Sequence, residues 1–433
     1  MTSHTYRTLF RTPEFTPLFM ASSAHIAAQT VGGLALGTLV FRMTDSPLLS
    51  AVSMFGPSLA QVLGATFFLS AADRLPPRAT MTGIALAFAA ATALLAVPGL
   101  PVWALFAVVL AQGVIASVGG GVRWGLLNEI LAGDAGDAGD AGDAGDAGDA
   151  GDDGDGGDAG NSGYLLGRSV FNMMSGIMQI TGYATGGVLV ALLSPRPSLL
   201  LAAALYAAAA AGALGGLTAR PPRASGRPSV KATWRTNAVL WSARPRRHVY
   251  LALWVPNGLV VGCESLYVSY APHAAGTLFA CAALGMLAGD IAVGRLLPPR
   301  LRPRLGVPLL ALLAAPYLAF ALRPPLPVAA ALVAVASVGF GASLVQQQRL
   351  MALTPSRLAG HALGLHSAGM LTMQGAAAAL AGTVAQLTSP ATAMTAMAAA
   401  SLAATLALTA AGRRGAQDGG PLPRSGPVRT TAR

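Results

Sequence analysis

The chain has 433 residues, of which 54% are hydrophobic and 10% are charged. Roughly a quarter of the residues in soluble proteins are charged, so this composition excludes an ordinary soluble domain and favours a membrane protein. The net charge is +11, although ten of the 17 acidic residues lie in one tract, Asp134 to Asp158. The two cysteines, Cys263 and Cys281, lie in apolar runs and predict neither a disulfide framework nor a zinc site.

Apolar segments of about twenty residues, long enough to cross a hydrocarbon core roughly 30 Å thick, recur along the chain. The first is too long for a cleaved signal peptide, so we interpret it as a retained helix. The segments are Pro17–Phe41, Leu48–Ala71, Thr80–Val97, Val102–Gly121, Gly163–Leu193, Ser198–Leu217, Val249–Ala271, Ala274–Val293, Val307–Leu322, Val328–Val345, Leu358–Leu387 and Ala391–Ala411. They predict an all-α membrane protein with twelve transmembrane helices in two six-helix bundles.

Basic residues concentrate in alternate connections between these segments. Because Arg and Lys are retained on the cytoplasmic side, a cytoplasmic N-terminus leaves only Arg42, Arg196 and Arg323 facing outward. We therefore expect both termini to be cytoplasmic. Abundant Ala, Gly, Pro and Arg are typical of a G+C-rich bacterial gene, so we expect a multi-pass protein of a bacterial cytoplasmic membrane.

The predicted regions are an N-terminal bundle (1–217), a basic cytoplasmic linker (218–248), a C-terminal bundle (249–411) and a disordered cytoplasmic tail (412–433). The basic cluster at 219–248 can also indicate a nucleic-acid patch. Its position between two sets of membrane segments favours a cytoplasmic loop and no nucleic-acid partner.

A Gly-Asp-Ala repeat dominates the connection between the fourth and fifth segments. Dense like charges extend a chain and leave little to bury, so we expect residues 133–162 to form a disordered cytoplasmic loop. Weak binding of divalent cations is the alternative.

The second and eighth segments are followed by related sequences. The first contains Asp73-Arg74 and ends at Arg78, and the second contains Asp290 and Arg295. This internal repeat resembles the loop motif Gly-x-Leu-Ala-Asp-Arg-x-Gly-Arg-Arg of the major facilitator superfamily, whose two halves are parallel repeats. The resemblance implies a cytoplasmic gate in which carboxylates pair with arginines in one state and separate in the other. Alternatively, the arginines only determine topology.

The fifth predicted helix contains Gly182, Gly186 and Gly187, which match the family's antiporter signature Gly-Pro-x-x-Gly-Gly. Tyr183 stands where the signature has Pro. Small residues of this kind let helices approach closely. The pattern is similar to that of bacterial drug-efflux members.

Glu264 is the acidic residue that falls well within an apolar segment, and such a group is costly there unless it has a function. Helical spacing predicts that Asn257, Glu264 and Tyr267 share one face. A carboxyl group that moves between apolar and watery surroundings can take up and release a proton, which is one hypothesis for Glu264. It can also bind a cationic substrate group or pair structurally near the outer interface.

Other polar residues form stripes on neighbouring predicted helices. In the family, helices one, four, seven and ten line a central cavity, which implies that His25, Gln29, Gln112 and Glu264 lie near the substrate. A hydrogen-bonded packing role for His25 remains the alternative. The expected substrate and proton pathway comprises Glu264, His25, Gln29, Gln112, Asn172, Gln179, Asn257 and Tyr267.

The resemblance implies a transporter that moves small, partly hydrophobic molecules by alternating access, with proton-coupled efflux as the leading hypothesis. A proton-coupled uptake symporter and a non-transporting membrane sensor are the alternatives. We expect a monomer in the lipid bilayer that binds a small-molecule substrate and protons. The sequence shows no catalytic nucleophile with its base, no phosphate loop and no metal cluster. We therefore expect neither an enzyme nor a metal site nor a cofactor.

Overall fold

The computed structural model describes residues 9–68, 75–140, 156–222, 230–298, 300–355 and 358–418, and these ranges contain no strand. Twelve segments within them are long and apolar enough to cross a membrane. Lipid offers no hydrogen-bond partners to the backbone, whereas a helix pairs its own N–H and C=O groups. Helices are therefore expected in such an apolar chain. The chain is therefore an all-α, multi-pass membrane protein, as the sequence predicts.

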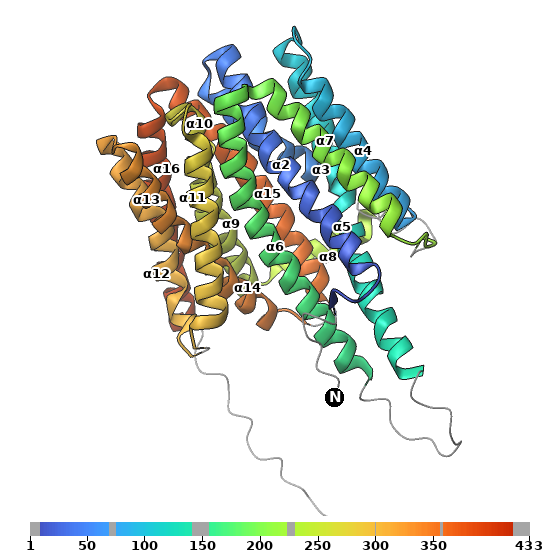
Figure 1. Cartoon of the computed structure of the whole chain (residues 1–433). Coiled ribbons are helices and arrows are strands. Elements are labelled where there is room, and N and C mark those ends of the chain that lie inside the picture. Colours follow the sequence, from blue (N-terminus) through green and yellow to red (C-terminus); the bar gives the residue numbers. More distant parts are fainter. Residues whose placement is uncertain are drawn as a thin grey trace, which may run out of the picture.

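The first six spans form the N-terminal half (Figure 1). They are α2 (Phe15–Thr44), α3 (Pro47–Phe68), α4 (Pro77–Leu95), α5 (Val102–Asp140), α6 (Gly156–Leu193) and α7 (Pro195–Gly216). Helix α2 packs against both α6 and α7, while α4 packs on α7 and α3 on α5. This half buries a cluster that includes Phe15, Leu18 and Phe171.

The last six spans form the C-terminal half, which follows a connecting helix, α8 (Val230–Ser242). Its elements are α9 (Arg244–Glu264), α10 (Tyr267–Tyr270), α11 (Ala275–Ile291), η2 (Ala292–Leu296), α12 (Arg302–Ala314), η3 (Ala315–Leu322), α13 (Leu326–Val338), η4 (Gly339–Gly341), α14 (Ala342–Ala352), α15 (Ala359–Leu387) and α16 (Pro390–Asp418). Several spans combine two or three of these elements, because residues such as Pro316 and Gly339 interrupt regular helices.

The two halves lie side by side, with α6 (green) against α11 (yellow) and α3 against α15 (Figure 1). We call the end that holds the connections at residues 44–47, 193–195 and 387–390 the contact end. We call the opposite end, where α2 and α9 begin, the terminal end. These two names are used below to place the polar residues.

Several helices extend beyond the predicted boundaries. Of the loop expected at 133–162, residues 133–140 and 156–162 are helical, because α5 ends at Asp140 and α6 begins at Gly156. The expected disordered tail likewise starts as helix, since α16 continues to Asp418. Extending an existing helix requires no new nucleation, so a helix can continue past the end of its apolar segment. Residues 141–155 and 419–433 lie outside the described residues.

The expected linker at 218–248 is partly helical and packs on the C-terminal half. Helix α8 carries Trp241, whose ring stacks on that of Trp254 of α9 with centroids 5.5 Å apart and an interplanar angle of 7°. The ring of Tyr250 packs against both tryptophans, with its centroid 5.1 Å from that of Trp254 and 6.2 Å from that of Trp241. These aromatic contacts attach the end of the linker to the half that follows it.

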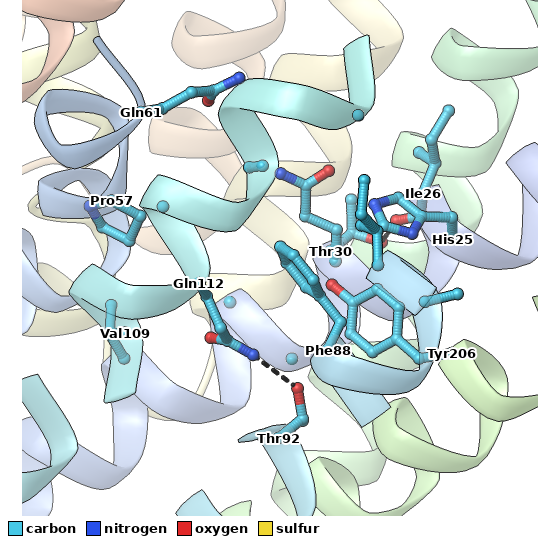
Figure 2. A pocket seen from close by; sticks show the side chains of 18 of the residues that line it. His25, Ile26, Thr30, Pro57, Gln61, Phe88, Thr92, Val109, Gln112 and Tyr206 are labelled. Atoms are coloured by element: carbon cyan, nitrogen blue, oxygen red, sulfur yellow. Dashed lines mark hydrogen bonds between the residues drawn. The ribbon is translucent and has the colours of Figure 1, made fainter. Parts of the chain in front are cut away.

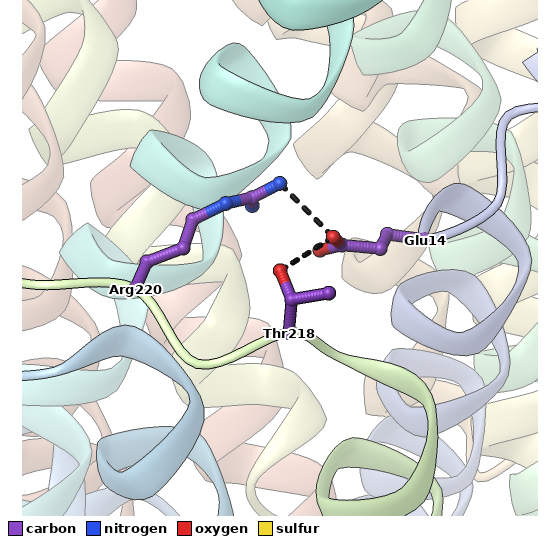
Figure 3. Close-up of polar contacts among 3 residues, drawn as sticks. All are labelled: Glu14, Thr218 and Arg220. Carbon is purple, nitrogen blue, oxygen red and sulfur yellow. Dashed lines mark hydrogen bonds and ion pairs between the residues drawn. The ribbon is translucent and has the colours of Figure 1, made fainter.

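A polar contact connects the two ends of the N-terminal half (Figure 3). Glu14, directly before α2, accepts hydrogen bonds at Oε1 from Thr218 Oγ1 at 2.6 Å and from Arg220 Nη2 at 3.1 Å. Thr218 and Arg220 follow the last residue of α7. The contact therefore fixes the start of the first span to the chain that leaves the sixth.

Replacing Glu14 by Ala should lower the free energy of unfolding by about 1–2 kcal/mol, because a partly buried ion pair and a charge-assisted hydrogen bond are both lost. A double-mutant cycle of Glu14→Ala and Arg220→Ala, measured by denaturation of the purified protein, should show coupling. Arg42→Ala, at an exposed position, is the control. Strictly additive effects of the two substitutions would show that the contact contributes no coupling energy.

Candidate functional site

A cavity of about 580 Å³ lies mainly in the N-terminal half. Faces of all six N-terminal spans line it, and Leu371 and Gln374 of α15 complete it from the other half. Both halves therefore bound the cavity, but the N-terminal half supplies most of its wall.

One face of α5 supplies a continuous part of the wall. Gln112, Ala116, Gly119 and Arg123 follow one another at spacings of four, three and four residues, which places them on the same side of a helix. The small residues at 116 and 119 leave space between the amide and the guanidinium group. Since α5 runs from the contact end to the terminal end, Arg123 lies toward the terminal end of the cavity.

Aromatic rings from three helices meet in the cavity wall (Figure 2). The ring centroid of His25 on α2 lies 5.4 Å from that of Phe88 on α4 and 5.0 Å from that of Tyr206 on α7. Nearby, Gln112 Nε2 donates a hydrogen bond to Thr92 Oγ1 at 3.0 Å. The wall thus combines aromatic surface with amide and hydroxyl groups.

Four of the predicted pathway residues line this cavity, namely His25, Gln29, Gln112 and Gln179. The side chain of Asn172 lies outside the described residues. Arg123 also lines the cavity but was not predicted as a site residue, because the apolar segment that placed the fourth span ends at Gly121. The helical spacing between Gln112 and Arg123 is the sequence feature that would have identified Arg123.

Glu264, Asn257 and Tyr267 are not among the residues that line the cavity. Asn257 and Glu264 lie two turns apart on α9, whereas the chain turns after Glu264 and Tyr267 begins the next helix, α10 (Tyr267–Tyr270). Asn257 Nδ2 instead donates to Leu253 O at 2.9 Å and to Ser343 Oγ at 3.1 Å. The three residues of the expected stripe therefore lie outside the lining of this cavity.

Glu264 is 6% exposed and lies in a buried group of tyrosines. Tyr267 and Tyr317 are hydrogen-bonded through their hydroxyl groups, and both interact electrostatically with Glu264. Glu264 Oε1 has no hydrogen-bond partner among the described residues. A buried carboxyl group in this situation is costly, which makes it a candidate for a function other than packing.

Tyr183 connects this buried group to the cavity. It lines the cavity from α6, interacts electrostatically with Glu264, and stacks on Phe279 of α11 with ring centroids 4.8 Å apart. Tyr183 stands at the proline position of the glycine signature that the sequence resembles. One side chain of the N-terminal half therefore contacts the C-terminal half, the cavity and the surroundings of Glu264.

The glycines around Tyr183 allow two close helix contacts. Gly182 and Gly186 face α2, where a Cβ atom on Gly186 would lie 3.3 Å from Val31 Cα. Gly187 faces the other half, and a Cβ atom there would lie 2.8 Å from Gly276 Cα on α11. The third glycine thus allows the backbones of the two halves to meet.

A second contact between the halves lies at the contact end. Ser46 Oγ, before α3, donates a hydrogen bond to Gln386 Oε1 on α15 at 2.8 Å. Next to it, a Cβ atom on Gly382 of α15 would lie 2.7 Å from Leu48 Cα on α3. The halves are therefore held together at this end along both α6–α11 and α3–α15.

The predicted gating residues are only partly described. Asp73 and Arg74 lie outside the described residues. Arg78 Nη2 donates to the backbone oxygen of Leu214, so this contact joins α4 to α7 within one half. Asp290 is exposed on α11, and Arg295 lies in the π-helical turn η2. The described part of the chain contains no cluster of three His, Cys, Asp or Glu side chains that could hold a metal ion.

No family model and no curated protein matches the chain. Solved structures do match it in fold. A POT family transporter in complex with a thioalcohol conjugated peptide has a TM-score of 0.68 at 9% identity, covering 92% of this chain and 96% of that one. The nucleoside transporter NupG has a TM-score of 0.67 at 14% identity, covering 91% and 98%.

The human organic anion transporter MFSD10 has a TM-score of 0.59 at 18% identity, covering 92% of this chain and 99% of that one. These likenesses extend over almost the full length of each chain. The fold is therefore the twelve-helix fold of the major facilitator superfamily.

Adding a side chain at Gly187 should separate the halves at the contact end. With Cys263 and Cys281 replaced by Ala, a Ser46→Cys/Gln386→Cys pair should crosslink efficiently with a short bis-methanethiosulfonate reagent. Gly187→Val should reduce the yield severalfold. A Glu14→Cys/Thr218→Cys pair, within one half, is the matched control and should crosslink equally with and without Gly187→Val. Equal yields for the first pair would contradict a close contact at Gly187.

Proposed function

We infer that the chain is a secondary transporter that moves a small, partly hydrophobic molecule across the membrane through this cavity. The observation that carries the proposal is a cavity lined by both halves, whose walls meet closely at one end. A fold of two helix bundles around a central site permits alternating access by rocking of one bundle against the other. The similar solved structures named above are transporters of different solutes, which supports transport without identifying the cargo.

The distribution of arginines supports an orientation. The contact end carries Arg42, Arg196 and Arg323, whereas the terminal end carries a much larger set. That set includes Arg78, Arg220, Arg235, Arg244, Arg246, Arg247, Arg300, Arg302, Arg304 and Arg349. On the positive-inside rule we propose that the terminal end and both chain termini face the cytoplasm, in keeping with the expected bacterial membrane. In this orientation the structure corresponds to a state closed toward the outside.

We further propose that transport is proton-coupled efflux, with Glu264 as the group that carries the proton. Tyr183 supports the coupling, because it touches the cavity, the partner half and the surroundings of Glu264. When the halves separate along α6 and α11, the environment of Glu264 changes, and a carboxyl group responds by binding or releasing a proton. The glycine pattern at 182–187 supports the outward direction.

The direction can be tested by mass spectrometry of small molecules in cells that lack or overexpress the protein. Lower internal levels of a compound on overexpression, with higher levels in the medium, indicate efflux. Higher internal levels indicate the uptake symporter instead. No change in any compound would contradict transport.

Glu264→Gln should reduce pH-gradient-driven flux of the identified compound to near background, because an amide cannot carry the proton. Flux in proteoliposomes with an imposed pH gradient measures this, and exchange without a gradient should persist. Glu14→Gln, which alters a carboxylate outside the buried group, is the control. Unchanged gradient-driven flux in Glu264→Gln would remove Glu264 as the proton carrier.

A further inference from the structure

The cavity has an unequal charge distribution. Among its described lining residues Arg123 is the one Arg or Lys, and none is Asp or Glu. The remaining polar wall consists of neutral groups, including the amides of Gln29, Gln61, Gln112, Gln179 and Gln374. Glu264, the acidic residue that the sequence placed near the substrate, lies in the separate tyrosine group. The described lining therefore offers no carboxylate to a cationic cargo.

Arg123 lies beside the aromatic part of the wall. It is close enough to His25 for their charges to interact, and the His25 ring contacts those of Phe88 and Tyr206. A guanidinium group binds oxyanions through a planar fork of N–H donors. The neighbouring aromatic rings offer apolar surface to a flat part of the bound molecule. The guanidinium group and the aromatic rings therefore suit different parts of one molecule.

We propose that the cavity selects small organic anions, each with one oxyanion group held by Arg123 and an aromatic or apolar body packed against His25, Phe88 and Tyr206. This proposal rests on the proposed transport function and names its substrate class. Arg123 lies toward the terminal end, where a cargo from the cytoplasm would enter in the orientation proposed above. Gln29 and Gln179 supply additional hydrogen-bonding groups without adding charge.

A series of three probes with the same ring system tests the charge preference. The probes are 2-naphthoate, 2-naphthamide and 2-naphthylmethylamine, which are anionic, neutral and cationic. Binding to the full-length protein in nanodiscs, measured by calorimetry, should be at least tenfold tighter for 2-naphthoate than for the other two. This comparison uses the wild-type protein, so it does not depend on whether a variant folds.

Substitutions then test the residue. Arg123→Gln should weaken 2-naphthoate binding at least tenfold and leave 2-naphthamide binding unchanged, while Arg123→Lys should retain part of the preference. Arg42→Gln removes an arginine at an exposed position outside the cavity and should bind like the wild type. Failure of the wild type to bind 2-naphthoate, equal binding of all three probes, or an unaltered preference in Arg123→Gln would each overturn the proposal.

Flux in everted membrane vesicles separates this proposal from transport itself. Accumulation of 2-naphthoate that depends on the protein and on Arg123 supports both. Accumulation of the neutral or cationic probe in preference to 2-naphthoate retains the transporter but overturns the anion selectivity. Accumulation of none of the three probes, together with unchanged cellular metabolites, contradicts transport.

Discussion

Close packing of α6 on α11, where Gly187 meets Gly276, is a constraint on which the arrangement of the two halves depends, together with the packing of α3 on α15. Helices in lipid gain little from the hydrophobic effect when they associate, so close van der Waals packing has to hold them together. Here that packing brings two backbones into contact, and a Cβ atom on Gly187 would lie 2.8 Å from Gly276 Cα. The packing of the two glycines involves no covalent bond or ion pair, which suits an interface that is proposed to open.

Tyr183 gives this contact a chemical consequence. It packs on Phe279 next to the glycine pair, while its other surroundings are the cavity and Glu264. The residues proposed for cargo and for the proton are thus in separate places, Arg123 in the cavity and Glu264 among tyrosines. In this account, movement along α6 and α11 couples the two sites, because each site includes part of that interface or lies against it.

The sequence predicts the architecture well and the site only in part. Apolar length finds all twelve spans, because crossing the hydrocarbon core imposes that length. His25, Gln29, Gln112 and Gln179, each within a regular helix, line the cavity. Arg123 was missed because α5 continues past its apolar segment. Helical spacing did not extend to Tyr267 because α9 ends at Glu264. Contacts such as Gly187 with Gly276 depend on tertiary packing, which spacing along the sequence does not reveal.

Reciprocal motion of the two ends is the central claim, and pulsed electron paramagnetic resonance measures it directly. One pair of spin labels at Asp45 and Ser389 reports on the contact end, and another at Ala79 and Ala352 reports on the terminal end. Introducing Gly187→Val in nanodiscs should lengthen the first distance and shorten the second, as expected for rocking. Lengthening of both distances, or a change confined to the contact end, would contradict the account.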